Sequence, residues 1–194
     1  IVDCDWSSDV CSSDLDAPMP MDYFVWAVVS QERSYVIDMG FTQEEAKRRK
    51  RDWLRCPADS LSLIGLNPAS VKDVIISHMH YDHVGAFEKF TSAQFHVQEA
   101  EMHYATGRYM RYPKLRHSYN IEDVCGLVRL NFAQRVLMYN GDDELAPGIS
   151  LHFVGGHAAG MQCIRVHTKR GWVVLASDCS HYYENMEKYR PFVT

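Results

Sequence analysis

Four residues with metal-binding side chains lie within six positions of this chain: His78, His80, Asp82 and His83. His78 and His80 are two positions apart, so an extended backbone can direct both imidazoles toward one ion. Asp82 and His83 lie farther along and can serve a second ion. Imidazole and carboxylate groups bind zinc, and they also bind iron or manganese. The run therefore predicts a site for divalent metal, most simply for Zn²⁺.

Two later residues can complete such a site. His157 follows Gly155 and Gly156, which permit a sharp backbone path and a close approach to an ion. Asp178 comes directly after an apolar run at 172–177, and a carboxylate at that point can bridge two ions. Each residue alone is more typical of a structural role, but together with the first run both are predicted to be metal ligands.

The elements that must position these residues can be outlined from hydrophobic pattern and turn signals. An apolar run at 71–77 predicts a buried strand that leads directly into His78. Strands and helices elsewhere alternate in groups, and an irregular segment at 108–120 could cover the site as a lid. The other predicted strands are 23–29, 34–38, 94–97, 135–139, 149–154, 162–167 and 172–177. The predicted helices are 46–55 (after a Thr42–Glu45 capping box), 58–66, 98–106 and 121–130. This order predicts a layered α/β or α+β domain.

Composition narrows the class of protein. The chain has 194 residues, which suits one domain, and a net charge of −5, which predicts no nucleic-acid partner. The basic run 47–51 is expected to be a solvated helix face. No apolar stretch of about 18 residues exists, so no membrane partner is expected. The six cysteines form no CxxC pair and no secretory signal is visible, so we expect reduced thiols and a cytoplasmic location.

The first fifteen residues differ from the rest of the chain. The stretch 7–10 is echoed by 12–15 around Cys11, and the segment has no helical or strand period. We expect residues 1–15 to be a foreign or disordered tail, and residues 16–194 to form a partial domain.

From about Asp22 onward the chain resembles the metallo-β-lactamase-fold hydrolases. The resemblance rests on HMHYDH at 78–83, GGH at 155–157 and Ser177-Asp178, in the family's order, and on Asp38-Met39-Gly40. It implies an incomplete αββα sandwich with two metal ions, in which Asp38 supports the site without binding metal. The implied ligands are His78, His80 and His157 for the first ion, Asp82 and His83 for the second, and Asp178 as the bridge.

The resemblance also implies one more histidine for the second ion, well downstream of the bridging aspartate. Sixteen residues follow Asp178, and the only histidine among them is His181. We expect His181 to lie too close to Asp178 to replace the downstream ligand. The early part of the family's sheet is also not found before Asp22, so both ends are expected to be truncated.

Within this family the chain is most similar to the N-acyl homoserine lactonases, through residues 156–162 and 177–186. The similarity implies a hydrolase that opens a lactone ring with a metal-bound hydroxide, and Asp82 would pass a proton to the leaving alkoxide. Lactonases of this type have a substrate-contacting tyrosine three residues after the bridging aspartate. Here that position is His181, so the role is assigned to Tyr182, for which packing at a helix start is the alternative.

Three alternatives stay open on sequence alone. The first is another hydrolase of this fold that acts on a small ester or thioester, such as a hydroxyacylglutathione thioesterase. The second is a persulfide dioxygenase with a single iron, which would need only one metal site. The third is a fragment with no activity.

Overall fold

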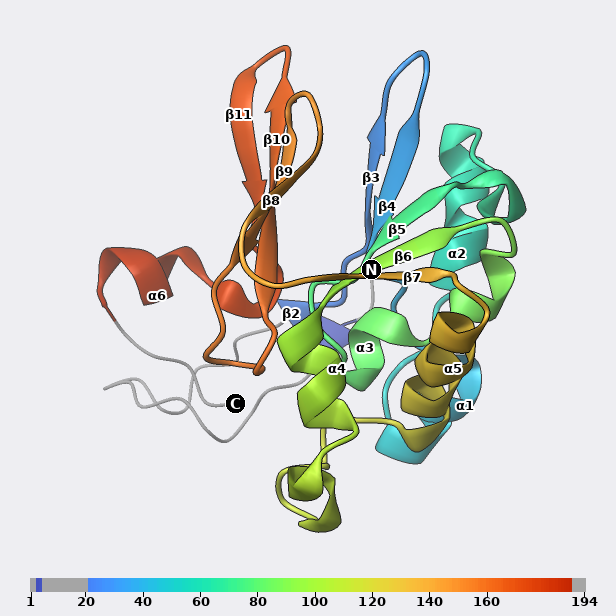
Figure 1. The fold of residues 1–194 in the computed structure, drawn as a ribbon, viewed down its shortest axis with the longest axis vertical. Helices are drawn as coiled ribbons and strands as arrows, with labels where there is room; N and C mark the ends of the chain where they lie inside the picture. Colours follow the sequence, from blue (N-terminus) through green and yellow to red (C-terminus); the bar gives the residue numbers. More distant parts are fainter. Residues whose placement is uncertain (1–2, 5–20, 190–194) are drawn as a thin grey trace.

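The computed structural model describes residues 3–4 and 21–189, and its strands form two larger sheets that stand beside one another (Figure 1). In the five-stranded sheet the order is β3-β4-β5-β6-β7. The first pair is antiparallel, and the other three pairs are parallel. Its strands are β3 (Trp26–Val29), β4 (Ser34–Ile37), β5 (Asp73–Ile75), β6 (Gln94–Gln98) and β7 (Val136–Tyr139).

The four-stranded sheet is antiparallel throughout, in the order β11-β10-β9-β8. Its strands are β8 (Asp143–Ala146), β9 (Ile149–Phe153), β10 (Gln162–Thr168) and β11 (Gly171–Leu175). Two short strands, β1 (Asp3–Cys4) and β2 (Met21–Asp22), pair with each other. The first of these lies in the predicted tail, whose residues 1–2 and 5–15 are outside the described residues, and the domain boundary at residue 16 stays a prediction.

Alternation along the strands explains how the layers hold together. Tyr35 and Ile37 of β4 pack with Ile164 of β10, so one face of the five-stranded sheet meets the other sheet. Val36, which lies between them in sequence, belongs to a second core with Leu127 of the helix α5 (Ile121–Phe132). Because successive strand residues point to opposite faces, a single four-residue strand contributes to both cores.

The helices are short, and most flank the five-stranded sheet. Figure 1 shows α1, α2 and α5 on its side away from the four-stranded sheet, while α6 lies beside the four-stranded sheet. The helices are α1 (Gln43–Arg49), α2 (Pro57–Ser60), α3 (Tyr81–Val84), α4 (Glu99–Ala105), α5 (Ile121–Phe132) and α6 (Tyr183–Glu187). Short 3-10 turns cover Leu61–Ile64, Pro68–Ser70, Phe87–Lys89, Arg108–Arg111 and Ser177–Cys179. None of the described helices has the length and apolar character needed to cross a bilayer.

The structure corrects several predicted boundaries. The first helix ends at Arg49, not near residue 55, because Lys50 takes a left-handed φ of 56° and its N–H caps the helix. The helix predicted at 58–66 divides into α2 and a 3-10 turn. Strand β8 was missed, since most of its residues are exposed or half-buried and carry little hydrophobic pattern.

The basic run is only partly a solvated face. Thr42 accepts a hydrogen bond from the Glu45 N–H as predicted, but the buried Glu45 carboxylate binds the guanidinium groups of Arg48 and Arg49. The Arg49 side chain is 10% exposed, and its guanidinium lies 3.7 Å from the Tyr81 ring centre. This basic residue therefore anchors α1 to the start of α3 instead of facing solvent.

One buried carboxyl in this layer gives a test of the packing. Burial raises the pKa of Asp123 on α5 to about 7, and the neighbouring carboxylates of Glu45, Glu122 and Glu88 add to the shift. The folded-state pKa exceeds the unfolded value of about 3.8, so stability is lost as pH rises from 4 through 7. We expect Asp123→Asn to stabilise the metal-free protein by on the order of 3 kcal/mol at pH 8.

The gain in stability from Asp123→Asn should be smaller at pH 5, where Asp123 is protonated in the folded protein. Thermal or urea unfolding of both proteins in chelator at pH 5 and pH 8 measures the difference. An equal effect of the substitution at both values of pH would contradict this account of Asp123.

Candidate metal centre

Three segments bring the candidate ligands to one end of the two sheets. The loop after β5 carries His78 and His80 and continues into α3, which carries Asp82 and His83. The loop between β9 and β10 carries His157, and the turn after β11 carries Asp178. Met79 is fully buried in the core beside the helices, so the run alternates between core and site. The backbone that leaves β5 therefore anchors Met79 in the core and places His78 and His80 in the site.

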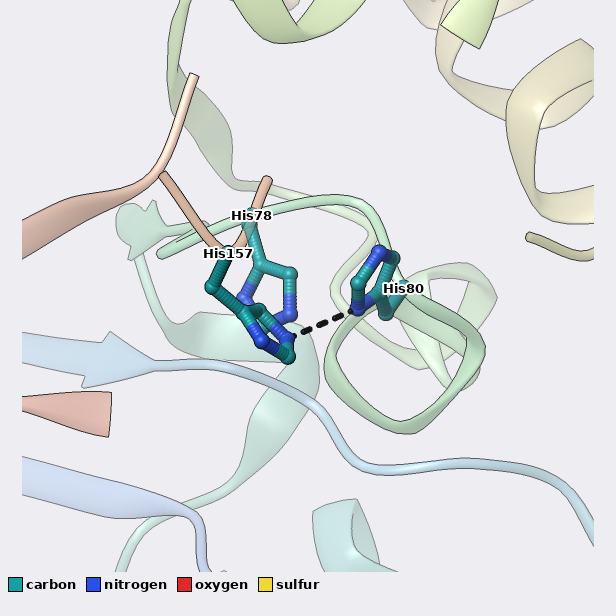
Figure 2. Close-up of side chains that lie close together, drawn as sticks. All are labelled: His78, His80 and His157. Carbon is teal, nitrogen blue, oxygen red and sulfur yellow. Dashed lines mark hydrogen bonds between the residues drawn. The ribbon is translucent and has the colours of Figure 1, made fainter. Parts of the chain in front are cut away.

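Three histidines form the first group of possible ligands: His78, His80 and His157. Figure 2 shows their rings directed toward one another, and their ligand nitrogens lie within 4.8 Å. His157 Nε2 lies 3.1 Å from His80 Nδ1. Two nitrogens bound tetrahedrally to one zinc ion would be about 3.3 Å apart. His78 Nε2 is buried and, among the described residues, has no hydrogen-bond partner, which is the state expected of a metal-binding nitrogen. These three residues therefore fit a divalent metal.

A second group consists of His78, His83 and Asp178. One carboxylate oxygen, Asp178 Oδ2, lies 3.6 Å from His83 Nε2, 3.8 Å from His78 Nε2 and 3.3 Å from His157 Nε2. This oxygen therefore lies between the two groups of histidines, where a bridging ligand would have to be.

The structure adds a histidine that the sequence reasoning set aside. His181 Nε2 lies 3.5 Å from Asp178 Oδ2, and His157, Asp178 and His181 form a third group of possible ligands. A kinked 3-10 turn covers Ser177–Cys179, and the residue three positions after Asp178 lies beside it. The group joins His181 to His157 and not to His83 or Asp82, so the expectation that His181 does not replace the more distant histidine stays a prediction.

Two other predicted residues stand differently. Asp82 belongs to none of the three described groups, although its Oδ2 lies 3.6 Å from His83 Nε2. Tyr182 is half-buried and precedes α6, where its backbone N–H donates to Asn185 Oδ1. The catalytic roles of Asp82 and Tyr182, and metal binding by Asp82, stay predictions.

Asp38 supports the site through hydrogen bonds, as the resemblance of Asp38-Met39-Gly40 to the family's motif implied. Its buried carboxylate accepts hydrogen bonds from the Ser77 N–H and Oγ–H, both at 2.7 Å, and lies 2.8 Å from His83 Nδ1. If His83 donates from Nδ1, its Nε2 lone pair is directed toward Asp178 and is available to a metal. Ser77 Oγ also lies 3.1 Å from His78 Nδ1, which leaves Nε2 of His78 for the site in the same way.

Burial and charge set the protonation of these groups. Burial lowers the pKa of His78 well below its usual value, and burial with the nearby His157 lowers the pKa of His80 to about 3. Both imidazoles are therefore neutral at ordinary pH, as metal ligands must be. Burial opposes charge on His83, but Asp38, Asp82 and Asp178 outweigh it and raise the pKa of His83 well above normal. The three carboxylates around the His83 imidazole give this part of the site a negative electrostatic environment, which favours a positive charge.

Comparisons with known proteins give this arrangement a context. Residues 20–191 match the metallo-beta-lactamase superfamily. An N-acyl homoserine lactonase from Bacillus cereus is 34% identical over 133 residues, which cover 68% of this chain and 48% of that protein. The lactonase AiiB of Agrobacterium fabrum is 30% identical over 125 residues, or 62% of this chain and 45% of its own length. The chain thus spans about half the length of the curated relatives it matches.

Solved structures agree in fold. A quorum-quenching N-acyl homoserine lactone lactonase is 25% identical, with a TM-score of 0.79 over 98% of this chain and 75% of that one. An N-acyl homoserine lactone hydrolase with the product N-hexanoyl-L-homoserine at its catalytic metal centre is 23% identical. Its TM-score is 0.80, over 99% of this chain and 77% of its own.

The position of His181 gives a test that separates it from the other histidines. We expect His181→Ala to weaken the binding of at least one of the two equivalents of zinc by about 10- to 100-fold, because a nitrogen beside Asp178 is lost. Isothermal titration of the metal-free protein with zinc measures both equivalents. His152→Ala is the matched control, since His152 binds Asp142 and Ser150 and belongs to none of the three groups. A two-site titration curve unchanged by His181→Ala would remove His181 from the centre.

Proposed function

The chain belongs to the metallo-β-lactamase superfamily. We propose that it forms the metal-binding part of a hydrolase that opens lactone rings, with N-acyl homoserine lactones as substrates. Family membership confirms the expected α/β metallo-β-lactamase-type fold. One observation carries the chemistry: Asp178 Oδ2 lies 3.3–3.8 Å from nitrogens of His78, His83, His157 and His181. The choice of lactone over other esters is supported by the similarity to the curated lactonases.

Two ions, which we take to be Zn²⁺ with Fe or Mn as alternatives, would be held by the residues of this cluster. The first ion would be bound by His78, His80 and His157. The second would be bound by Asp82 and His83, with Asp178 as the bridge. His181, which is grouped with His157 and Asp178, would be an added ligand beside the bridge. Such ions provide an activated water at neutral pH and polarise the lactone carbonyl.

The chain's own residues supply orientation and a proton. Asp38 holds His83, and Ser77 holds both Asp38 and His78, so the imidazoles need little reordering when substrate arrives. Burial, with the nearby Asp178 carboxylate, raises the pKa of Asp82 even though His83 opposes the shift. When the metal is bound, the Asp82 carboxylate would accept the proton released as water attacks the lactone carbonyl and pass it to the alkoxide that leaves when the ester bond breaks. The product is the ring-opened hydroxy acid.

We further propose that the protein acts in the cytoplasm, because Cys56, Cys125, Cys163 and Cys179 carry free thiols. The arrangement of the candidate ligands favours a hydrolase with two metal ions and a small-molecule lactone substrate over a persulfide dioxygenase with a single iron. The reason is that the described cluster offers two further groups of ligands beyond His78, His80 and His157.

The proposed function is tested by acid release from N-acyl homoserine lactones, followed with a pH indicator after loading with zinc, cobalt or manganese. We expect metal-dependent hydrolysis that falls by at least 100-fold in His78→Ala, because His78 belongs to two of the ligand groups. The His152→Ala variant should keep its rate.

Parallel assays use S-lactoylglutathione for the thioesterase and glutathione persulfide with iron for the dioxygenase. Activity on either of these, with no acid release from the lactones, would overturn the lactonase assignment.

A further inference from the structure

Glu101 is a fully buried carboxylate on α4 that belongs to none of the described ligand groups. Its Oε1 accepts hydrogen bonds from the Met79 backbone N–H and from the Tyr119 hydroxyl, both at 3.0 Å. Its Oε2 accepts from the Gly160 N–H at 2.6 Å. An ionised carboxylate is costly to bury unless hydrogen bonds replace its water, and these three donors serve that purpose.

Two of the three donors, the Met79 and Gly160 N–H groups, come from the segments that carry the first group of histidines. Met79 lies between His78 and His80 in the chain, so its N–H belongs to the backbone that sets the direction of both rings. Gly160 follows His157 by three residues in the loop between β9 and β10. One carboxylate therefore ties together two loops that supply all three imidazoles.

Close packing at Gly160 supports this reading. A Cβ built on Gly160 would lie 2.4 Å from both the backbone nitrogen and the Cβ of Glu101. Only glycine allows the two backbones to approach in this way. The loop between β9 and β10 therefore packs tightly against α4 at the point where the Gly160 N–H donates to the Glu101 carboxylate.

Tyr119 extends the link to the segment that was predicted as a lid. Its ring stands edge-on to the His80 ring, with centroids 5.0 Å apart, while its hydroxyl donates to Glu101. Burial and the Glu101 carboxylate raise the pKa of Tyr119, so this hydroxyl keeps its proton. This edge-on contact limits the rotation of the His80 ring.

We propose that Glu101 is a positioning residue of the metal centre, which fixes His80 and His157 at their 3.1 Å separation by holding Met79, Gly160 and Tyr119. The inference rests on the proposed metal-dependent function, but it concerns metal binding and not the choice of substrate. Glu101 itself touches neither metal nor substrate in this assignment.

The test compares Glu101→Gln with two other variants. An amide side chain has one accepting oxygen, so its NH₂ group must face at least one of the three donors. We expect zinc affinity at the first site to fall by about 10- to 100-fold, measured by competition with a chelating dye. The visible absorption spectrum of the cobalt-loaded protein should also change, because the angle between the imidazoles changes. Tyr119→Phe, which removes one donor and keeps the ring, should have a smaller effect.

Leu127→Ala controls for lost stability. Leu127 is fully buried on α5 in the core beside the helices and lies in neither loop. This variant should lower the melting temperature of the metal-free protein while it keeps the zinc affinity and cobalt spectrum of the original chain. If Glu101→Gln does not fold, Gly160→Ala disturbs the same contact from the other side and should give the same loss of affinity.

The proposal would be overturned if Glu101→Gln bound zinc with unchanged affinity and gave an unchanged cobalt spectrum. It would also be overturned if Leu127→Ala lost as much zinc affinity as Glu101→Gln. A chain that binds zinc tightly but opens no lactone would refute the proposed function and leave the role of Glu101 intact, so the two failures are distinguishable.

Discussion

Four imidazole nitrogens from three separate segments lie within 3.8 Å of a single carboxylate oxygen, Asp178 Oδ2. Placing so many like groups together in a buried region is unfavourable unless a cation and well-placed hydrogen bonds compensate. The strand ends of two different sheets must therefore meet within a narrow tolerance. The core formed by Tyr35, Ile37 and Ile164 between the sheets keeps them at a fixed separation. The geometry of the cluster therefore depends on this inter-sheet packing.

Two buried carboxylates, Asp38 and Glu101, support the cluster from different elements. Asp38 follows β4 and holds His83 and Ser77, while Glu101 lies on α4 and holds the backbone beside His80 and His157. Each binds to segments far from it in sequence. The cluster is thus fixed mainly by long-range hydrogen bonds to its surroundings, which is typical of sites that need defined ligand directions.

The sequence allowed local features to be predicted, and long-range ones less well. The strand before His78 and the capping interaction of Thr42 depend on neighbours in the chain, and their patterns were sufficient. The placement of His181 required a turn whose backbone angles are not visible in residue types. The burial of Arg49 depends on Tyr81, and the role of Glu101 depends on Gly160, and both partners are distant in sequence. The sequence identified six of the candidate ligands, and the resemblance pointed to the supporting Asp38, while the role of Glu101 could be seen only in three dimensions.

The side chains of residues 78–80 alternate between the metal cluster and the hydrophobic core, and this limits how the chain can change in evolution. His78 and His80 face the cluster, while Met79 is buried in the hydrophobic core. Deleting or inserting one residue between β5 and His80 would exchange the two faces, since side-chain direction alternates with each position. Core packing and the ligand set would then be lost in the same event. We therefore expect homologous chains to keep a constant length from β5 to α3, while the exposed turn around Arg111 and Lys114 can vary in length.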